Sequence, residues 1–293
     1  MATASKDDYP LERSFLGASR LYFTHWLWDK LLGHLLHPSI PRTNDMRVAD
    51  IACGSGYPQT GDNNPCRIWL LDLAKELSKS KISAQLDGFD ISTKMYPPPI
   101  TLPTNVRLDT LDIFQPIPEA LRGWYDVVHI RLLCLVIPNG DPRPVLDNIL
   151  TLLKPGGYIQ WDDSDFGNIY CPSSNPELKC TNLEKEREWI YKVPLSRLGG
   201  ISNFKWISEL EHIFQSRDIA VIQDGLFAQD DDIAYSHAWT IMHMMGLEEL
   251  ASASGEGSKE VHELLERAAE EVRQGGSFNM DLVSVVGRKA GGI

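Results

Sequence analysis

Three aspartates and two glycines have the residue types and the spacing of a small-molecule binding site. Asp50 ends the apolar run RVAD and is followed closely by Gly54 and Gly56. Glycine has no Cβ, so the backbone at these two positions can turn sharply and approach a ligand closely. Asp90 ends the run LDGFD, and Asp112 follows the next apolar run, in LDIF. The three acids therefore come one after another at the ends of successive strand candidates.

The order of these acids along the chain suits a single ligand. A carboxylate at Asp50 stabilises a nearby ammonium group, and one at Asp90 can accept both hydroxyl protons of a ribose. Asp112 could then accept from the exocyclic amine of adenine. Ammonium, ribose and adenine together describe S-adenosylmethionine. The dinucleotide fingerprint G-x-G-x-x-G fails because Gln59 occupies the third glycine position, which disfavours a nicotinamide oxidoreductase.

The hydrophobic pattern predicts alternating strands and helices that would position the acids. Strands are expected at 47–52, 84–92, 105–114, 125–133, 157–165, 219–228 and 278–289. Helices are expected in the first 40 residues and at 65–80, 143–154, 182–192, 203–217, 232–251 and 258–274. This alternation is typical of an α/β fold with a mostly parallel sheet covered by helices on both faces.

The chain resembles the class I S-adenosylmethionine-dependent methyltransferases, and within that class the fungal secondary-metabolism group often called UMTA-like. The runs that carry the resemblance are VADIACGSG, AQLDGFDIS with MYPPP, YDVVHIRLL and DPRPVLDNILTLLKPGGYIQWDD. The resemblance implies a Rossmann-like methyltransferase fold with a seven-stranded sheet. It also implies an N-terminal helical arm at 1–41 and a single methyltransferase domain at 42–293, with helical cap insertions at about 167–203 and 229–276.

The resemblance further implies S-adenosyl-L-methionine as the cofactor and S-adenosyl-L-homocysteine as the product. The expected cofactor-binding residues are Asp50, Ala52, Gly54, Gly56, Asp90, Ile91, Asp112, Ile113, His129 and Arg131. Ala52 replaces the first glycine of the general methyltransferase pattern. In similar proteins the next helix follows the glycine loop almost at once, so the intervening residues 57–67 are interpreted as an insertion.

Methyl transfer is an SN2 displacement on a reactive sulfonium, so a base is needed only where the acceptor arrives protonated. His129 follows the fourth strand candidate and His25 lies in the N-terminal helix, and both are candidate catalytic bases. In the alternative interpretation His129 packs within its strand and Arg131 binds the cofactor carboxylate or a structural acid. The substrate-binding candidates are Tyr22, Trp161, His237, Trp239 and Met242. Trp239 and Met242 could equally be helix core.

Composition excludes some functions and favours others. The 293 residues carry a net charge of −12, and no clustered Lys/Arg stripe offsets it, which argues against a nucleic-acid partner. The five cysteines contain no C-x-x-C and no metal motif is found, so no metal is expected. The N-terminal residues lack a signal peptide and no apolar run could span a membrane, which favours a cytoplasmic protein. The oligomeric state is left open.

The function favoured by these observations is methyl transfer to a small molecule, with a hydroxyl of a fungal secondary metabolite as the first choice and an amine, thiol or acidic carbon as the others. Two further classes stay open. One is a regulatory protein that has a methyltransferase domain and acts through protein partners. The other is an enzyme that keeps the cofactor but catalyses a rearrangement or cyclisation, in which the sulfonium serves as a fixed charge.

Overall fold

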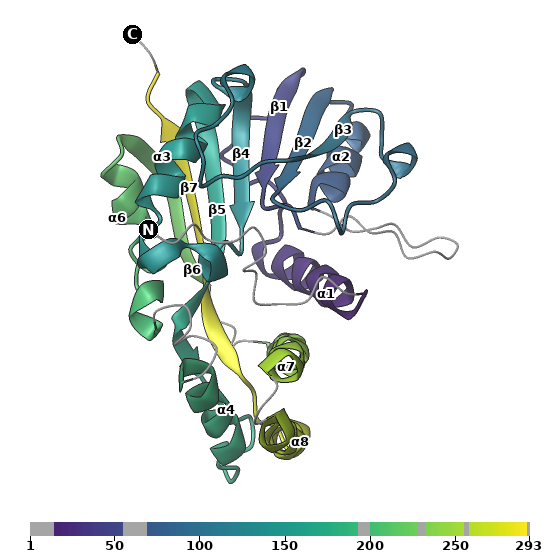
Figure 1. Ribbon diagram of the computed structural model, residues 1–293, viewed down its shortest axis with the longest axis vertical. Coiled ribbons are helices and arrows are strands. Elements are labelled where there is room, and N and C mark those ends of the chain that lie inside the picture. Colours follow the sequence, from purple (N-terminus) through teal and green to yellow (C-terminus); the bar gives the residue numbers. More distant parts are fainter. Residues whose placement is uncertain (1–14, 55–68, 193–199, 228–231, 255–257, 292–293) are drawn as a thin grey trace.

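A computed structural model describes residues 15–54, 69–192, 200–227, 232–254 and 258–291. Its centre is a seven-stranded sheet in the order β3-β2-β1-β4-β5-β7-β6 (Figure 1). The strands are β1 Met46–Ile51, β2 Ala84–Asp90, β3 Val106–Thr110, β4 Tyr125–Arg131, β5 Leu153–Tyr170, β6 Ile219–Phe227 and β7 Asn279–Lys289. Strands β1 to β5 pair in parallel, and β7 runs antiparallel to both β5 and β6. The predicted mostly parallel α/β sheet is confirmed.

Helices cover both faces of the sheet and one of its ends (Figure 1). The α-helices are α1 Phe15–Leu32, α2 Trp69–Lys79, α3 Arg143–Leu152, α4 Thr181–Lys192, α6 Leu210–Gln215, α7 Ile233–Ser254 and α8 Ser258–Arg273. Single 3-10 turns occur at Pro99–Thr101, Glu119–Leu121, Cys134–Val136, Pro138–Gly140 and Ile201–Phe204. The predicted helix at 203–217 is therefore wrong in extent, since only its second half is α-helical.

Alternation along the central strands divides the core into two layers. Met46 and Val48 of β1 pack with α2, whereas Ala49 and Ile51 belong to the larger cluster on the other side of the sheet. Side chains of a strand point alternately to the two faces, and both faces of β1 are apolar because helices or loops cover each one. The carboxyl ends of β1, β2 and β4 point toward α1 (Figure 1).

Strands β5 and β7 continue beyond the rest of the sheet as a long antiparallel ribbon (Figure 1). Their pairing extends to Tyr170 and Asn279, with a register shift between Ser164 and Ile169. Strand five was predicted to end at residue 165 and a cap insertion to begin at about 167. The structure corrects the end of the strand, which continues to Tyr170. Helix α4 packs on α8, and α8 packs on α7, around this ribbon. The boundaries of arm, domain and insertions stay a prediction.

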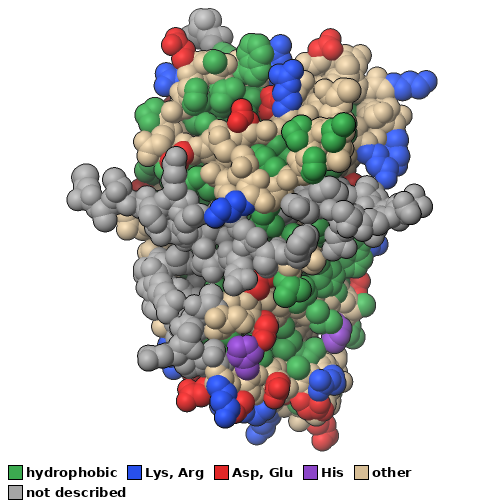
Figure 2. Space-filling model, turned by 45° about the vertical axis from the view of Figure 1, so that its right-hand side comes forward, with side chains coloured by type: hydrophobic (Ala, Val, Ile, Leu, Met, Phe, Trp, Pro, Cys, Tyr) green, Lys and Arg blue, Asp and Glu red, His purple; other side chains and the backbone are tan. Residues whose placement is uncertain are grey.

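The surface of the described residues carries charges of both signs. Figure 2 shows Lys and Arg side chains interspersed with Asp and Glu on the face that it presents. In the described ranges, no helix is long and apolar enough to cross a membrane. In the same ranges, no group of three His, Cys, Asp or Glu side chains is placed to hold a metal ion.

Candidate functional site

The chain leaves β1 through a tight turn at the carboxyl edge of the sheet. Ala52 and Gly54 have φ angles of 54° and 68°, in the left-handed region that favours glycine. Among the described residues, a Cβ at Gly54 would meet Leu21 Cδ1, at 3.8 Å, and the Ala52 carbonyl oxygen, at 4.0 Å. Gly54 therefore lies beneath α1, with room for a group to approach its backbone. The predicted cofactor residue Gly56 and the proposed insertion at 57–67 lie outside the described residues.

Asp90 closes this turn from the neighbouring strand. The Gly54 N–H donates to Asp90 Oδ2 at 3.0 Å, and the Ser92 N–H donates to Asp90 Oδ1 at 3.1 Å. Both carboxylate oxygens are thus oriented by backbone groups, and the side chain is half-buried. Hydrogen bonds from backbone N–H groups stabilise the ionised form of a carboxylate, so Asp90 is presented as an oriented acceptor at the end of β2.

Asp112 follows β3 rather than ending it. The Leu111 N–H donates to the Asp90 carbonyl at 3.0 Å, which joins the two segments through their backbones. Asp112 Oδ1 accepts from the Phe114 N–H at 3.0 Å. Of the two isoleucines expected near the cofactor, Ile91 is 37% exposed and Ile113 is buried. Asp90 and Asp112 therefore lie at the same edge of the sheet.

A row of polar side chains crosses the sheet from β1 to β5 on the face that α2 covers. Asp50 and His129 are direct cross-strand neighbours, because β1 pairs with β4 in that register. His129 donates through Nδ1 to Asp50 Oδ1 at 2.7 Å and through Nε2 to Asp162 Oδ2 at 3.3 Å. The ring of Trp69 stacks on the imidazole with 3.8 Å between centroids and 2° between planes.

This row holds buried charges of opposite sign. Burial alone would lower the pKa of His129, but hydrogen bonds and charges from Asp162 and Asp50 outweigh it and raise the pKa above its ordinary value. Burial would raise the pKa of Asp162, yet His129 lowers it, with help from hydrogen bonds donated by Ser284 and Gln160. We infer an imidazolium between two carboxylates.

A second histidine ties α1 to the same edge of the sheet. Arg131, the last residue of β4, donates from Nη2 to His25 Nδ1 at 2.8 Å. His25 donates in turn from Nε2 to Asp72 Oδ2, on α2, at 3.0 Å. Burial, and then the charge of Arg131, lowers the pKa of His25 against the opposing effect of Asp72. The ring is therefore neutral and links α1, β4 and α2.

The geometry does not support either histidine as a catalytic base. Both ring nitrogens of His129 and of His25 already have partners, and the two residues are 1% and 3% exposed. Neither ring offers a nitrogen to a substrate proton in this arrangement. Asp50 was expected to receive the ammonium group of a ligand, and its Oδ1 instead accepts from His129.

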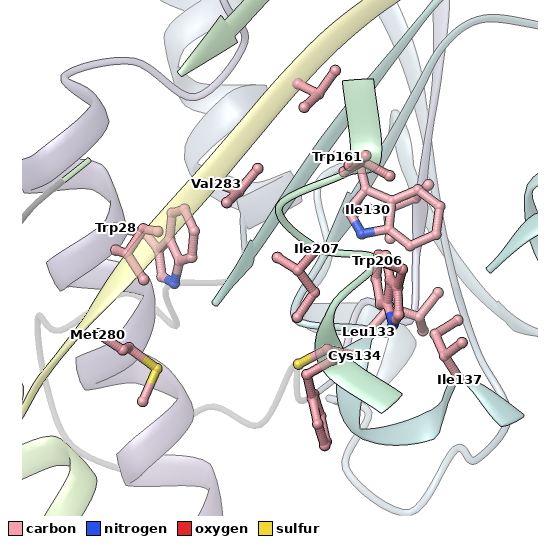
Figure 3. Close-up of a cluster of buried hydrophobic side chains, with 14 of the residues drawn as sticks. Trp28, Ile130, Leu133, Cys134, Ile137, Trp161, Trp206, Ile207, Met280 and Val283 are labelled. Atoms are coloured by element: carbon pink, nitrogen blue, oxygen red, sulfur yellow. The ribbon is translucent and has the colours of Figure 1, made fainter. Parts of the chain in front are cut away.

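The substrate-binding candidates lie in different places. Trp161 is fully buried, with its ring 5.5 Å from that of Trp206, and it packs beside Ile130 (Figure 3). Its position does not support substrate contact, because the side chain of Trp161 points from β5 into the hydrophobic core. Trp239 and Met242 are also buried, whereas His237 is exposed on α7 and Tyr22 is half-buried on α1.

Five members of the polar network were not among the predicted site residues: Trp69, Asp72, Gln160, Asp162 and Ser284. Asp72 and Ser284 lie far along the chain from their partners, so no sequence spacing links them. Gln160 donates to Asp162 Oδ2 at 2.9 Å and accepts from the His37 N–H. The only available signal was a polar residue within the apolar strand run at Gln160.

Solved structures with the same architecture bind S-adenosylmethionine. The chain aligns over 99% of its length with phosphoethanolamine N-methyltransferase 2 of Haemonchus contortus in complex with S-adenosyl-L-methionine, at 14% identity, 61% coverage of that chain and a TM-score of 0.52. A second structure of that enzyme, with phosphomonomethylethanolamine and S-adenosylhomocysteine, gives 15% identity and a TM-score of 0.50, with 98% of this chain and 61% of the other covered. The chain has the class I methyltransferase fold.

Curated relatives of this methyltransferase-fold chain are fungal proteins. Methyltransferase grgD of Penicillium sp is 38% identical over 135 residues, which is 45% of this chain and 43% of the relative. N-methyltransferase tcpN of Claviceps purpurea is 36% identical over 145 residues, 48% of this chain and 46% of the relative. N-methyltransferase verN of Clonostachys rogersoniana is 40% identical over 95 residues, 31% of each.

The chain spans less than half the length of each of these three relatives. No protein-family model matches it. The resemblance to class I S-adenosylmethionine-dependent methyltransferases is nevertheless confirmed, because the sequence and structure comparisons both lead to them.

Proposed function

We propose that this chain binds S-adenosyl-L-methionine and transfers its methyl group to a small-molecule acceptor. The observation that carries the proposal is the 3.0 Å hydrogen bond from the Gly54 N–H to Asp90 Oδ2. It joins the open glycine turn of β1 to an oriented carboxylate at the end of β2, close to the point where the strand order reverses. Ligands of open α/β sheets bind at this switch point.

The residues present fit the cofactor. Asp90 would hold the ribose hydroxyls, Asp112 the adenine amine, and the backbone at Gly54 the methionine end. The carboxylates of Asp50, Asp90 and Asp162 outnumber the cations of His129 and Arg131, which leaves an excess of negative charge suited to a cationic ligand. When bound, the group supplies an electrophilic methyl on a sulfonium, and the chain provides positioning.

Two kinds of atom are candidates to receive the methyl group. The sequence favours a hydroxyl of a fungal secondary metabolite. A nitrogen is a second candidate, supported by two relatives that are named N-methyltransferases. The setting is proposed to be cytosolic, which agrees with the described cysteines Cys53, Cys134, Cys171 and Cys180 being unpaired thiols. The displacement needs no metal in this scheme.

A labelling experiment tests the proposal. The full chain is incubated with S-adenosylmethionine that carries a deuterated methyl group and with fungal metabolite extracts, and products are analysed by mass spectrometry. A product with the label is expected from the wild type and from Asp224→Asn, a control at an exposed carboxylate on the outer strand β6. No labelled product is expected from Asp90→Ala.

Two other results would overturn methyl transfer. A metabolite converted to an isomer without label would indicate a rearrangement that keeps the cofactor. Absence of any metabolite change, together with stoichiometric recovery of transcription-factor partners in a pull-down, would indicate a regulatory protein.

A further inference from the structure

Five aromatic side chains form a contiguous cluster between α1, the β5–β7 ribbon and α7. We call this the aromatic cluster: Trp28, Phe166, Trp239, His243 and Phe278. The ring of Trp239 lies 6.5 Å from that of Trp28 and 5.3 Å from that of His243. The imidazole also lies 5.3 Å from Phe278 and 6.4 Å from Phe166. Trp28 is seen beside Met280 and Val283 of β7 in Figure 3.

Three ring nitrogens in the aromatic cluster are buried and have no hydrogen-bond partner among the described residues. They are Nε1 of Trp28, Nε1 of Trp239 and Nε2 of His243. Nearly all buried polar atoms in folded proteins are hydrogen-bonded, and an unsatisfied one costs about 1–3 kcal/mol. Three unsatisfied nitrogens on neighbouring rings therefore add up to a large free-energy cost in one place. A bound molecule of complementary polarity would remove this cost.

The protonation state of His243 defines what such a molecule must offer. Burial, followed by the charge of Arg20, lowers the pKa of His243 to about 3, so the ring stays neutral at physiological pH. Arg20 itself is paired with Glu249 at 3.1 Å. With its proton on Nδ1, the imidazole presents Nε2 as an acceptor, whereas the indoles of Trp28 and Trp239 present donors.

The aromatic cluster reaches both the solvent and the proposed cofactor site. His243 and Phe166 are half-buried, so two rings of the cluster lie nearer the surface than the others, and Met244, the next residue along α7, is also half-buried. Trp28 lies one helical turn from His25, which contacts Arg131 at the end of β4. Helix α1 therefore contacts the proposed cofactor side and the aromatic cluster at once.

We propose that the aromatic cluster binds the methyl acceptor, and that the acceptor is a neutral, flat, aromatic or heterocyclic molecule with an N–H or O–H donor for His243 and a carbonyl-type acceptor for the indoles. The inference rests on the proposed function only in that it identifies the bound molecule as the methyl acceptor. His243 is a positioning and specificity residue, and its low proton affinity makes it a hydrogen-bond acceptor rather than a base. The positive charge of Arg20, which acts on His243, disfavours a cationic acceptor.

Two matched probes test this site in the presence of S-adenosylhomocysteine. 2-Quinolone is flat and neutral and carries an N–H beside a carbonyl, and N-methyl-2-quinolone lacks only the N–H. Isothermal titration calorimetry with the wild type is expected to show 2-quinolone binding roughly 5- to 100-fold tighter, the range for one buried hydrogen bond to His243. His243→Phe keeps a ring but removes the acceptor, and it is expected to abolish the difference.

The controls separate this site from the cofactor site. His212→Phe, at an exposed histidine of α6, is expected to keep the wild-type discrimination. Trp239→Phe removes one indole donor with less change of shape, and it is expected to weaken both probes. Unchanged discrimination in His243→Phe, or no probe binding by a wild type that binds S-adenosylhomocysteine, would overturn the inference. Loss of S-adenosylhomocysteine binding with probe binding retained would overturn the proposed function instead.

Discussion

His129 and Asp50 form a hydrogen-bonded pair across adjacent strands, with 2.7 Å between Nδ1 and Oδ1 and only 1% and 5% of their side chains exposed. The pair sits where sequence reasoning placed a free carboxylate and a catalytic base. A charged pair inside the protein is stable only when its hydrogen-bonding capacity is well used. Asp162 supplies the second bond to the imidazole, and Trp69 stacks on the ring.

Replacing the central cation is expected to cost much of the stability. His129→Leu leaves Asp50 and Asp162 buried without their imidazolium partner, which is expected to lower the free energy of unfolding by about 3–5 kcal/mol. Urea denaturation followed by circular dichroism measures the change. His212→Leu, at an exposed histidine, is the control and should change stability by less than about 0.5 kcal/mol. A loss below about 1 kcal/mol for His129→Leu would contradict the charged-pair interpretation.

A buried carboxyl in the cap predicts a pH-dependent stability. Glu186 on α4 is 1% exposed, and neither of its oxygens has a hydrogen-bond partner in the part of the chain that the structure describes. Burial together with the charge of Glu271 raises its pKa to about 8. The unfolded chain ionises this group near its ordinary pKa of about 4.5. The folded state binds the extra proton between these values, so its contribution to stability falls as the pH rises from about 4.5 to about 8.

Glu186→Gln removes that dependence and is expected to stabilise the protein at pH 8, by at most about 3–5 kcal/mol for this shift. Thermal or urea unfolding across pH 5 to 9 measures it, with the exposed Glu188→Gln on the same helix as the control. Burial also raises the pKa of Asp163, to about 6. Asp163 therefore contributes to the pH dependence of stability, but by the same amount in every variant. Parallel pH profiles for the wild type and Glu186→Gln would show that Glu186 is ionised in the folded protein.

Alanine substitutions at two glycines with the same backbone angle distinguish the effect of backbone strain from the effect of lost ligand contact. Gly54 and Gly33 have φ angles of 68° and 69°, and at either position a Cβ would find no atom of the described ranges closer than 3.8 Å. Substitution by Ala is expected to cost each about 1 kcal/mol through the left-handed backbone. Only Gly54→Ala should also weaken binding of S-adenosylhomocysteine, measured by calorimetry. Equal affinity in the two variants would remove Gly54 from the site.

Local patterns in the sequence were enough to predict most of the sheet. The strands at 84–92 and 125–133 differ from β2 and β4 by two residues at one end, because their apolar runs are bounded by polar or turn-forming residues. The end of β5 was missed because 166–170 is stabilised by pairing with β7, which lies more than a hundred residues further along the chain. Pairing at that separation leaves no local signal.

The candidate site was predicted as an edge of the sheet but not as a network. Asp90 and Asp112 follow successive strands in the sequence. Because parallel strands end at the same edge of a sheet, the sequence predicts that these two acids lie at one edge. The pairing of Asp50 with His129 depends on the register of strands that are 79 residues apart. The burial of Trp161 follows from which face of β5 meets Trp206 and Phe214, a property of packing that the sequence does not state.

The central claim is that the carboxylate of Asp90 and the turn at Gly54 form the cofactor site, and calorimetric titration of S-adenosylhomocysteine tests it most directly. The wild type and Asp224→Asn are expected to bind with the same affinity, and Asp90→Ala at least about tenfold more weakly, because the ribose loses a charged acceptor. Undiminished binding by a folded Asp90→Ala would contradict the account.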